Sequence, residues 1–83
     1  MATEQQHENQ GKDFVDIKIN GTTYSIRRGH QTVVVIKQTG NVPLAYELEE
    51  VIEGKLTPLA DDGAVVIKGD EQFVSHPRSA GSS

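Results

Sequence analysis

Two alternating runs of apolar and polar side chains meet at an Asn-Gly dipeptide, and this pattern constrains the fold more than any other feature of the chain. Residues 15–19, VDIKI, alternate with the period of two that is typical of a strand buried on one face. Asn20 and Gly21 tolerate a positive φ, so they suit the two-residue turn of a hairpin. Residues 22–26, TTYSI, resume the alternation. The sequence therefore predicts an N-terminal β-hairpin.

The size and composition of the chain limit its core. A chain of 83 residues makes one domain, which buries about 60 % of the surface that its unfolded chain exposes. Because there is no cysteine, a disulfide framework, a thiolate metal site and a nucleophilic thiol are excluded. With two Phe, two Tyr and no Trp, the core must come from Val, Ile and Leu, which favours a compact α+β unit.

Charge and terminal composition exclude two classes of partner. Twelve acidic residues against eight basic ones give a net charge of -4, which is the wrong sign for holding a phosphate backbone, so we expect no nucleic-acid partner. Residues 1–13, MATEQQHENQGKD, contain no apolar run, so they are expected to be neither a secretory signal nor a membrane span. We expect residues 1–13 to be a disordered arm and the protein to be cytoplasmic.

The segment that follows the hairpin carries conflicting local signals. The run VVVI at residues 33–36 has strand propensity and poor helix propensity. However, Thr32 is suited to an N-cap, Gly40 lies where a helix often ends, and Pro43 stops a helix soon after. These signals predict a short helix, with a third strand of the hairpin as the alternative.

The helical period assigns faces to this segment. We expect Val33, Val35 and Ile36 to face the hairpin and the polar pair Lys37 and Gln38 to face water.

Residues 45–51, AYELEEV, predict a third strand with an acidic outer face. We expect Tyr46, Leu48 and Ile52 on one side of this strand and the glutamates Glu47, Glu49 and Glu53 on the other. Residues 54–63 contain turn-forming residues, so they are expected to be irregular structure from which Leu56 and Leu59 enter the core.

The last third of the chain predicts two further strands. Residues 64–67, AVVI, have the composition of a short buried strand, and residues 68–70, KGD, turn the chain. Residues 72–75, QFVS, predict a final strand, and Pro77 ends it because proline has no amide hydrogen for the ladder. We therefore expect a domain at residues 14–77 and a flexible C-terminal tail at residues 78–83.

The element order is that of the β-grasp fold, an α+β architecture in which one helix packs across a small mixed sheet. The segments IKINGTTYSI, VPLAYELEEV and DDGAVVIKGDEQFVSHP are similar to the pattern of the bacterial multi-ubiquitin domain family of ubiquitin-like proteins. The resemblance covers residues 15–77. Its most specific residues are Pro43, Tyr46 and Leu48 in one run and Gly69, Glu71, Phe73, Ser75 and Pro77 in the other.

The resemblance implies a protein modifier that is a substrate for enzymes and is not itself an enzyme. In such systems a partner activating enzyme uses ATP to adenylate the C-terminal carboxylate, so no cofactor is bound by the modifier. A conjugating enzyme then receives the acyl group as an ester or thioester, and an amine on a target protein finally accepts it. The family implies a body that is monomeric when free and that meets its enzymes in the cytoplasm.

The C-terminal sequence SHPRSAGSS suits such a role because its last residues have small side chains. Residues 78–81 span up to roughly 14 Å when extended, which is enough to enter a narrow catalytic channel. We expect partner enzymes to recognise the tail through Pro77, Arg78, Ser79 and Ala80. Gly81 is the expected acyl donor, since a residue without a Cβ leaves room for an adenylate.

Gly81 is followed by Ser82 and Ser83, so the modifier reading requires that a processing peptidase cut between Gly81 and Ser82. A frayed chain end is the alternative. Two other functions stay open for this fold. One is a sulfur carrier, although such carriers usually end in Gly-Gly. The other is a non-covalent adaptor that uses a sheet face or edge.

Other polar residues give weaker signals. His7, His30 and His76 are too scattered for zinc-site spacing, so no metal site is expected. The glutamates of residues 47–53 are expected to form a solvated face without a cleft that would shift their pKa values. The outward positions of the sheet read as polar, so we expect no binding to domains that recognise the apolar patch of ubiquitin.

Overall fold

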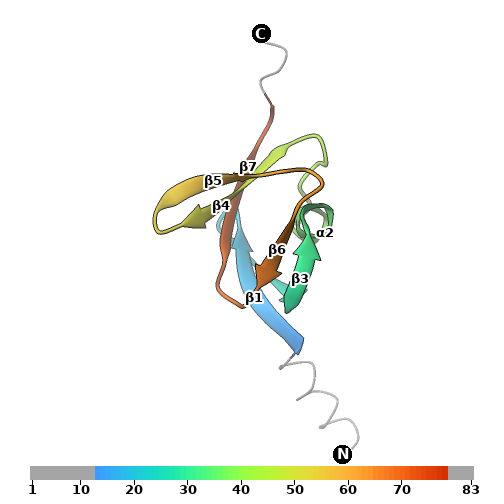
Figure 1. Ribbon diagram of the computed structural model, residues 1–83, viewed down its shortest axis with the longest axis vertical. Helices are drawn as coiled ribbons and strands as arrows, with labels where there is room; N and C mark the ends of the chain where they lie inside the picture. The colour runs from blue at the N-terminus through green and yellow to red at the C-terminus, as the bar shows by residue number, and fades with distance from the viewer. Residues whose placement is uncertain (1–12, 79–83) are drawn as a thin grey trace, which may run out of the picture.

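The computed structural model describes residues 13–78 and has an α+β architecture (Figure 1). Within these residues, one helix packs on a small mixed sheet of five strands, and a two-stranded sheet lies beside them. The elements are β1 (Phe14–Ile19), β2 (Thr22–Arg27), β3 (Gly29–Thr32), α2 (Val33–Thr39), β4 (Glu47–Ile52), β5 (Lys55–Leu59), β6 (Ala64–Ile67) and β7 (Gln72–His76).

The strand order of the larger sheet is β2-β1-β7-β4-β5. The neighbours β1 and β7 are parallel, whereas the other neighbouring pairs are antiparallel. The last strand, β7, therefore lies in the centre of the sheet and is paired on both sides. The smaller sheet pairs β3 with β6 in antiparallel register.

The predicted N-terminal hairpin is confirmed. Strands β1 and β2 pair from Ile19 opposite Thr22 to Phe14 opposite Arg27. Asn20 and Gly21 connect them with φ values of 54° and 84°, which is the left-handed geometry that the Asn-Gly dipeptide favours.

The predicted short helix is also confirmed, and its ends use the expected caps. The Thr32 hydroxyl accepts a hydrogen bond from the Val35 amide at 3.2 Å, and the Gly40 amide donates to the Ile36 carbonyl at 3.1 Å. Gly40 is required for a second reason, because a Cβ there would lie 2.6 Å from the Ile19 Cδ1 atom. The end of α2 therefore packs directly on strand β1.

The faces of α2 differ in part from the prediction. Val33 and Ile36 are buried as expected, whereas Val35 is 38 % exposed. The expectation that Lys37 faces water is wrong, because its exposed fraction is 1 %. Helical spacing places Lys37 beside Ile36 and Val33, and polar acceptors at the end of the sheet satisfy its ammonium group.

Strand β4 is confirmed, whereas the irregular structure predicted after it is wrong. Glu53 and Gly54 have φ values of 52° and 79°, and they form a tight turn from which β5 returns antiparallel to β4. Leu59 packs against the core as expected. Leu56 is 56 % exposed, because the register places it on the outer face. Ile52 lies on the same face as Leu48, as predicted, but its place at the hairpin tip leaves it 46 % exposed.

Strand β6 is confirmed in position, although it is buried only on one side. Ile67 is fully buried, whereas Val66 is 57 % exposed. Its partner β3 was not predicted, since the pairing of His30 with Val66 joins segments far apart in the sequence. The final strand β7 is confirmed and ends just before Pro77.

The core lies between α2 and the inner face of the sheet. Its buried side chains are Ile17, Ile19, Ile26, Val33, Ile36, Val42, Leu48, Ile67 and Phe73. They are aliphatic apart from Phe73, as the composition predicts.

Two leucine truncations test this description of the core. We expect Leu48→Ala, at a fully buried side chain, to lower the free energy of unfolding by about 2–5 kcal/mol. Leu56→Ala, the same change at an exposed side chain, should cost less than about 0.5 kcal/mol. Urea unfolding followed by circular dichroism measures both. Equal losses would contradict the observed register of β4 and β5.

Candidate functional site at the root of the C-terminal segment

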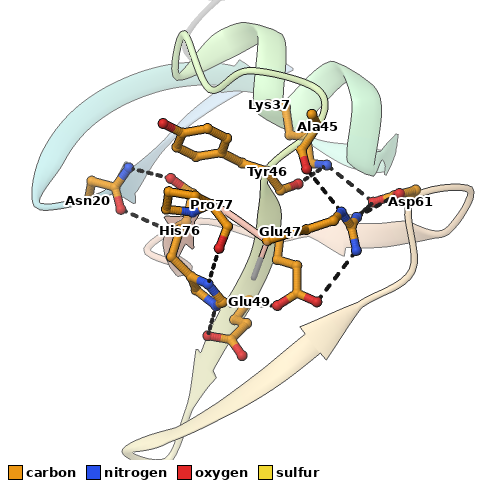
Figure 2. A network of polar contacts seen from close by, with 11 residues as sticks. Asn20, Lys37, Ala45, Tyr46, Glu47, Glu49, Asp61, His76 and Pro77 are labelled. Atoms are coloured by element: carbon orange, nitrogen blue, oxygen red, sulfur yellow. Dashed lines mark hydrogen bonds and ion pairs between the residues drawn. The ribbon is translucent and has the colours of Figure 1, made fainter. Parts of the chain in front are cut away.

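Polar side chains from five parts of the chain gather where β7 ends and the C-terminal segment begins (Figure 2). Asn20, in the turn of the first hairpin, clamps the end of β7 with two hydrogen bonds. Its amide Nδ2 donates to Ser75 Oγ at 2.8 Å, and its Oδ1 accepts from the Ser75 amide at 2.9 Å. The end of the central strand is thereby fixed beside the hairpin turn.

Arg78, the last described residue, contacts the domain through its whole guanidinium group. Nη2 donates to both carboxylate oxygens of Asp61, at 2.6 and 2.7 Å. Nε donates to the Ala45 carbonyl at 2.9 Å, and Nη1 lies 3.4 Å from Glu47 Oε2. One guanidinium nitrogen thus contacts both oxygens of the Asp61 carboxylate, and such charge-assisted hydrogen bonds are stronger than neutral ones. Although the sequence assigned Arg78 to a flexible tail, its side chain packs on the domain.

Lys37 reaches the same cluster from the inside of the molecule. Its side chain is 2 % exposed, and its Nζ donates to the carbonyls of Leu44 and Tyr46 at 2.9 and 2.5 Å. The third donor bond goes to Asp61 Oδ1 at 3.2 Å. A buried ammonium needs such partners, because burial without them costs several kcal/mol. Asp61 therefore joins the buried Lys37 to the exposed Arg78.

These contacts lower the pKa of the Asp61 carboxyl group below its ordinary value of 3.8. The hydrogen bond from Lys37 is the largest cause, and the positive charges of Arg78 and Lys37 act in the same direction. The carboxylate is thus ionised at any pH near neutrality.

His76, Glu47 and Glu49 form a second group at the same end of the sheet. Because Glu47 lies opposite His76 in the pairing of β4 with β7, their side chains share the outer face. His76 Nε2 lies 3.4 Å from Glu47 Oε1 and 3.4 Å from Glu49 Oε1. The other ring nitrogen, Nδ1, lies 3.2 Å from the Pro77 carbonyl oxygen. The Glu49 side chain is only 15 % exposed, so it is less solvated than the sequence predicts.

Glu50 faces away from this group. Burial raises the pKa of its carboxyl group, and the charge of Glu71 acts in the same direction. Glu71 itself accepts hydrogen bonds from the backbone amides of Lys68 and Gly69 at 2.7 and 2.8 Å. Glu71 therefore has a structural role in the turn before β7.

Glu47 and Glu49 lie on the outer face of β4 as predicted, but the outer face over β7, β4 and β5 also carries apolar residues. The register places Val51 beside Leu56, and it places Val74 and Pro58 on either side of Glu49. The four apolar residues Val51, Leu56, Pro58 and Val74 form what we call the outer apolar patch. Leu56 is its most exposed large side chain, at 56 %.

The outer face over β1 and β2 is polar, as predicted. An open hollow of about 340 Å³ lies there, and its lining residues are Asp16, Ile17, Lys18, Thr23, Asp70 and Gln72. The hollow holds both signs of charge, and we assign no function to it.

The structure brings two of the predicted site residues, Pro77 and Arg78, into the cluster. Ser79, Ala80, Gly81 and Ser82, which carry the predicted recognition, conjugation and processing, lie outside the described residues. Sequence reasoning missed Asp61 and Lys37. A lysine directly after an apolar helical run was the available signal for Lys37, whereas the loop position of Asp61 offered none.

Comparisons of the chain with family models, with curated proteins and with solved structures give no match. Among residues 13–78, no helix has the length and apolar character needed to cross a membrane.

Removal of the Lys37 charge tests the buried part of the cluster. We expect Lys37→Met to lower the free energy of unfolding by about 1–3 kcal/mol, because two carbonyls lose their donor. Lys55→Met, at an exposed position in β5, is the matched control and should change stability by less than about 0.5 kcal/mol. Urea unfolding measures both variants, and equal stabilities would contradict a structural role for Lys37.

The titration of Asp61 tests the contact with Arg78. Since the folded pKa is depressed, the stability that this group contributes is present above its ordinary value near 3.8 and is lost as the pH falls through the folded pKa. We expect Arg78→Gln to move the Asp61 midpoint upward in a carboxyl NMR titration. Arg27→Gln, which alters an arginine stacked on Phe14, should leave it unchanged. An unaltered midpoint in Arg78→Gln would show that the pairing does not form in solution.

Proposed function

We propose that this protein is a ubiquitin-like protein modifier with a β-grasp fold. The proposal draws on the parallel pairing of β1 with β7 in the centre of the mixed sheet, and on the single helix that follows the first hairpin among the described residues. The observation that carries it furthest is the origin of the C-terminal segment. This segment leaves the end of the central strand β7, and its first arginine is bound to the domain.

The chemistry of the proposal resides in Gly81. A peptidase hydrolyses the bond between Gly81 and Ser82 and frees the Gly81 carboxylate. In the activating enzyme a carboxylate oxygen attacks the α-phosphorus of ATP and displaces pyrophosphate. A hydroxyl or thiolate of the conjugating enzyme then displaces AMP to form an ester or thioester. An amine of the target protein finally displaces that enzyme group and forms an amide.

The contacts of Arg78 fix the start of the C-terminal segment on the domain. Because Arg78 is held by Asp61 and Ala45, residues 79–81 supply the reach, which is up to about 11 Å when extended. Ser79, Ala80 and Gly81 have small side chains, so a narrow channel in a partner enzyme can admit them. The anchored arginine also restricts the directions from which a partner can approach.

The outer apolar patch supports a second candidate function, that of a non-covalent adaptor. Exposed Leu56 and Pro58 beside Val51 and Val74 form an apolar surface at one side of the sheet. An adaptor would use this surface and would not need Gly81. The expectation that ubiquitin-binding domains do not bind this protein rested on a polar outer face. The outer apolar patch removes that argument.

Substitution of Gly81 separates the two functions. We expect Gly81→Phe to abolish transfer to target proteins, because the bulky side chain obstructs the adenylate and ester. Gly11→Phe, the same substitution far from the C-terminus in sequence, should leave transfer intact. The measurement is intact mass spectrometry of free and target-bound pools after expression with the partner enzymes and ATP.

A variant that ends at Gly81 distinguishes processing from transfer. If the peptidase step is real, this variant should form adducts without the peptidase, whereas the 83-residue chain should not. A full-length mass with no adducts, in the presence of active partners, would refute the modifier proposal. Target binding that is retained in Gly81→Phe and lost in Leu56→Asp would instead establish the adaptor.

A further inference from the structure

We propose that His76, Glu47 and Glu49 bind a divalent transition-metal ion, with zinc as the best match, at the root of the C-terminal segment. An imidazole nitrogen and two carboxylate oxygens are zinc ligands, and three protein ligands plus water complete a tetrahedral site. The three ligand atoms lie within 4.8 Å of one another. This inference does not depend on the proposed function.

The distances between the ligand atoms favour a shared ion. His76 Nε2 is 3.4 Å from an oxygen of Glu47 and from an oxygen of Glu49. Two ligands of a tetrahedral zinc ion are separated by about 3.3–3.5 Å, given bond lengths near 2.0–2.2 Å. An N–H···O hydrogen bond is usually about 2.9–3.0 Å long. The observed separation of 3.4 Å matches the distance between two ligands of one ion and is longer than a typical hydrogen bond.

The orientation of the His76 ring also supports a metal site. Nδ1 lies 3.2 Å from the Pro77 carbonyl oxygen, and a carbonyl can only accept, so Nδ1 carries the hydrogen of this bond. The second ring nitrogen, Nε2, faces the carboxylates of Glu47 and Glu49. Metal-bound histidines commonly have this arrangement, in which a backbone carbonyl fixes the ring and leaves the second nitrogen for the metal.

The two carboxylates are also held by groups outside the trio. Arg78 Nη1 lies 3.4 Å from Oε2 of Glu47, which leaves Oε1 directed at His76. Glu49 is placed between Val74 and Pro58 by the strand register, and its side chain is 15 % exposed. Two carboxylates with a neutral imidazole carry a charge that one divalent cation neutralises.

A bound ion would link β4 to the last residue of β7, directly before Pro77. Because Glu47 contacts both His76 and Arg78, the ion would also restrain the arginine that starts the C-terminal segment. The proposed ion would thus hold the end of β7 and the described start of the segment against β4.

Zinc titration of the untagged, metal-free full chain tests the proposal. Calorimetry should show saturable binding of one zinc ion per chain. We expect His76→Gln and Glu49→Gln each to weaken this binding by at least about tenfold, a loss that changes in outer-shell partners alone can cause. The matched controls are His30→Gln and Glu53→Gln, which make the same changes at exposed positions, and they should retain the affinity. Cobalt bound in place of zinc should show the intense visible absorption of a tetrahedral site.

Three results would overturn the proposal. They are an absence of saturable zinc binding, an affinity unchanged in His76→Gln, and a loss in His30→Gln as large as that in His76→Gln. Far-UV circular dichroism verifies the fold of each variant, and Glu47→Gln replaces Glu49→Gln if the latter unfolds. If the zinc affinity is unchanged in His76→Gln, pairing of His76 with the two glutamates explains the geometry without a metal. Since this assay uses neither ATP nor partner enzymes, its outcome is separate from that of the Gly81 experiment.

Discussion

The hydrogen bonds of the Lys37 ammonium group are the interaction on which the polar cluster at the end of β7 depends. The ammonium group is buried, and it donates to the Leu44 and Tyr46 carbonyls and to Asp61. A buried charge is tolerated only where such partners surround it. Its three bonds therefore tie α2 to the segment before β4 and to the loop after β5. Through Asp61 the same interaction reaches Arg78, so a buried side chain positions an exposed one.

Strand β7 fixes the place at which the C-terminal segment begins. It lies between β1 and β4 and is clamped at its end by Asn20, so the residues after it start from a rigid point. Glu47 joins the two polar groups at this point, because one carboxylate oxygen contacts His76 and the other contacts Arg78. The proposed cation and the anchored arginine would thus act on the same few residues. The electrostatics of the C-terminal root is a single coupled network.

The sheet also presents two distinct outer surfaces. The face over β1 and β2 carries charged and polar residues around an open hollow, whereas the face over β7, β4 and β5 carries the outer apolar patch. A partner enzyme that binds the C-terminal segment would also contact the outer apolar patch, because the segment follows β7 and the patch lies on β7, β4 and β5. Modification and non-covalent binding are therefore compatible uses of one molecule, although they require different residues.

Local signals in the sequence determined the first hairpin, the limits of α2 and the strands β4 and β7. Alternation, the Asn20-Gly21 turn, the Thr32 cap and Pro77 act over a few residues, so the sequence expresses them directly. Strand β5 does not follow from the sequence because Gly54 and Pro58 favour irregular structure, and β3 does not because its partner β6 is remote. Tertiary structure alone decided the pairing of Lys37 with Asp61 and the meeting of His76 with Glu47 and Glu49. The first contact joins residues 24 positions apart, and the second depends on the register of β4 with β7, so neither follows from neighbouring residues.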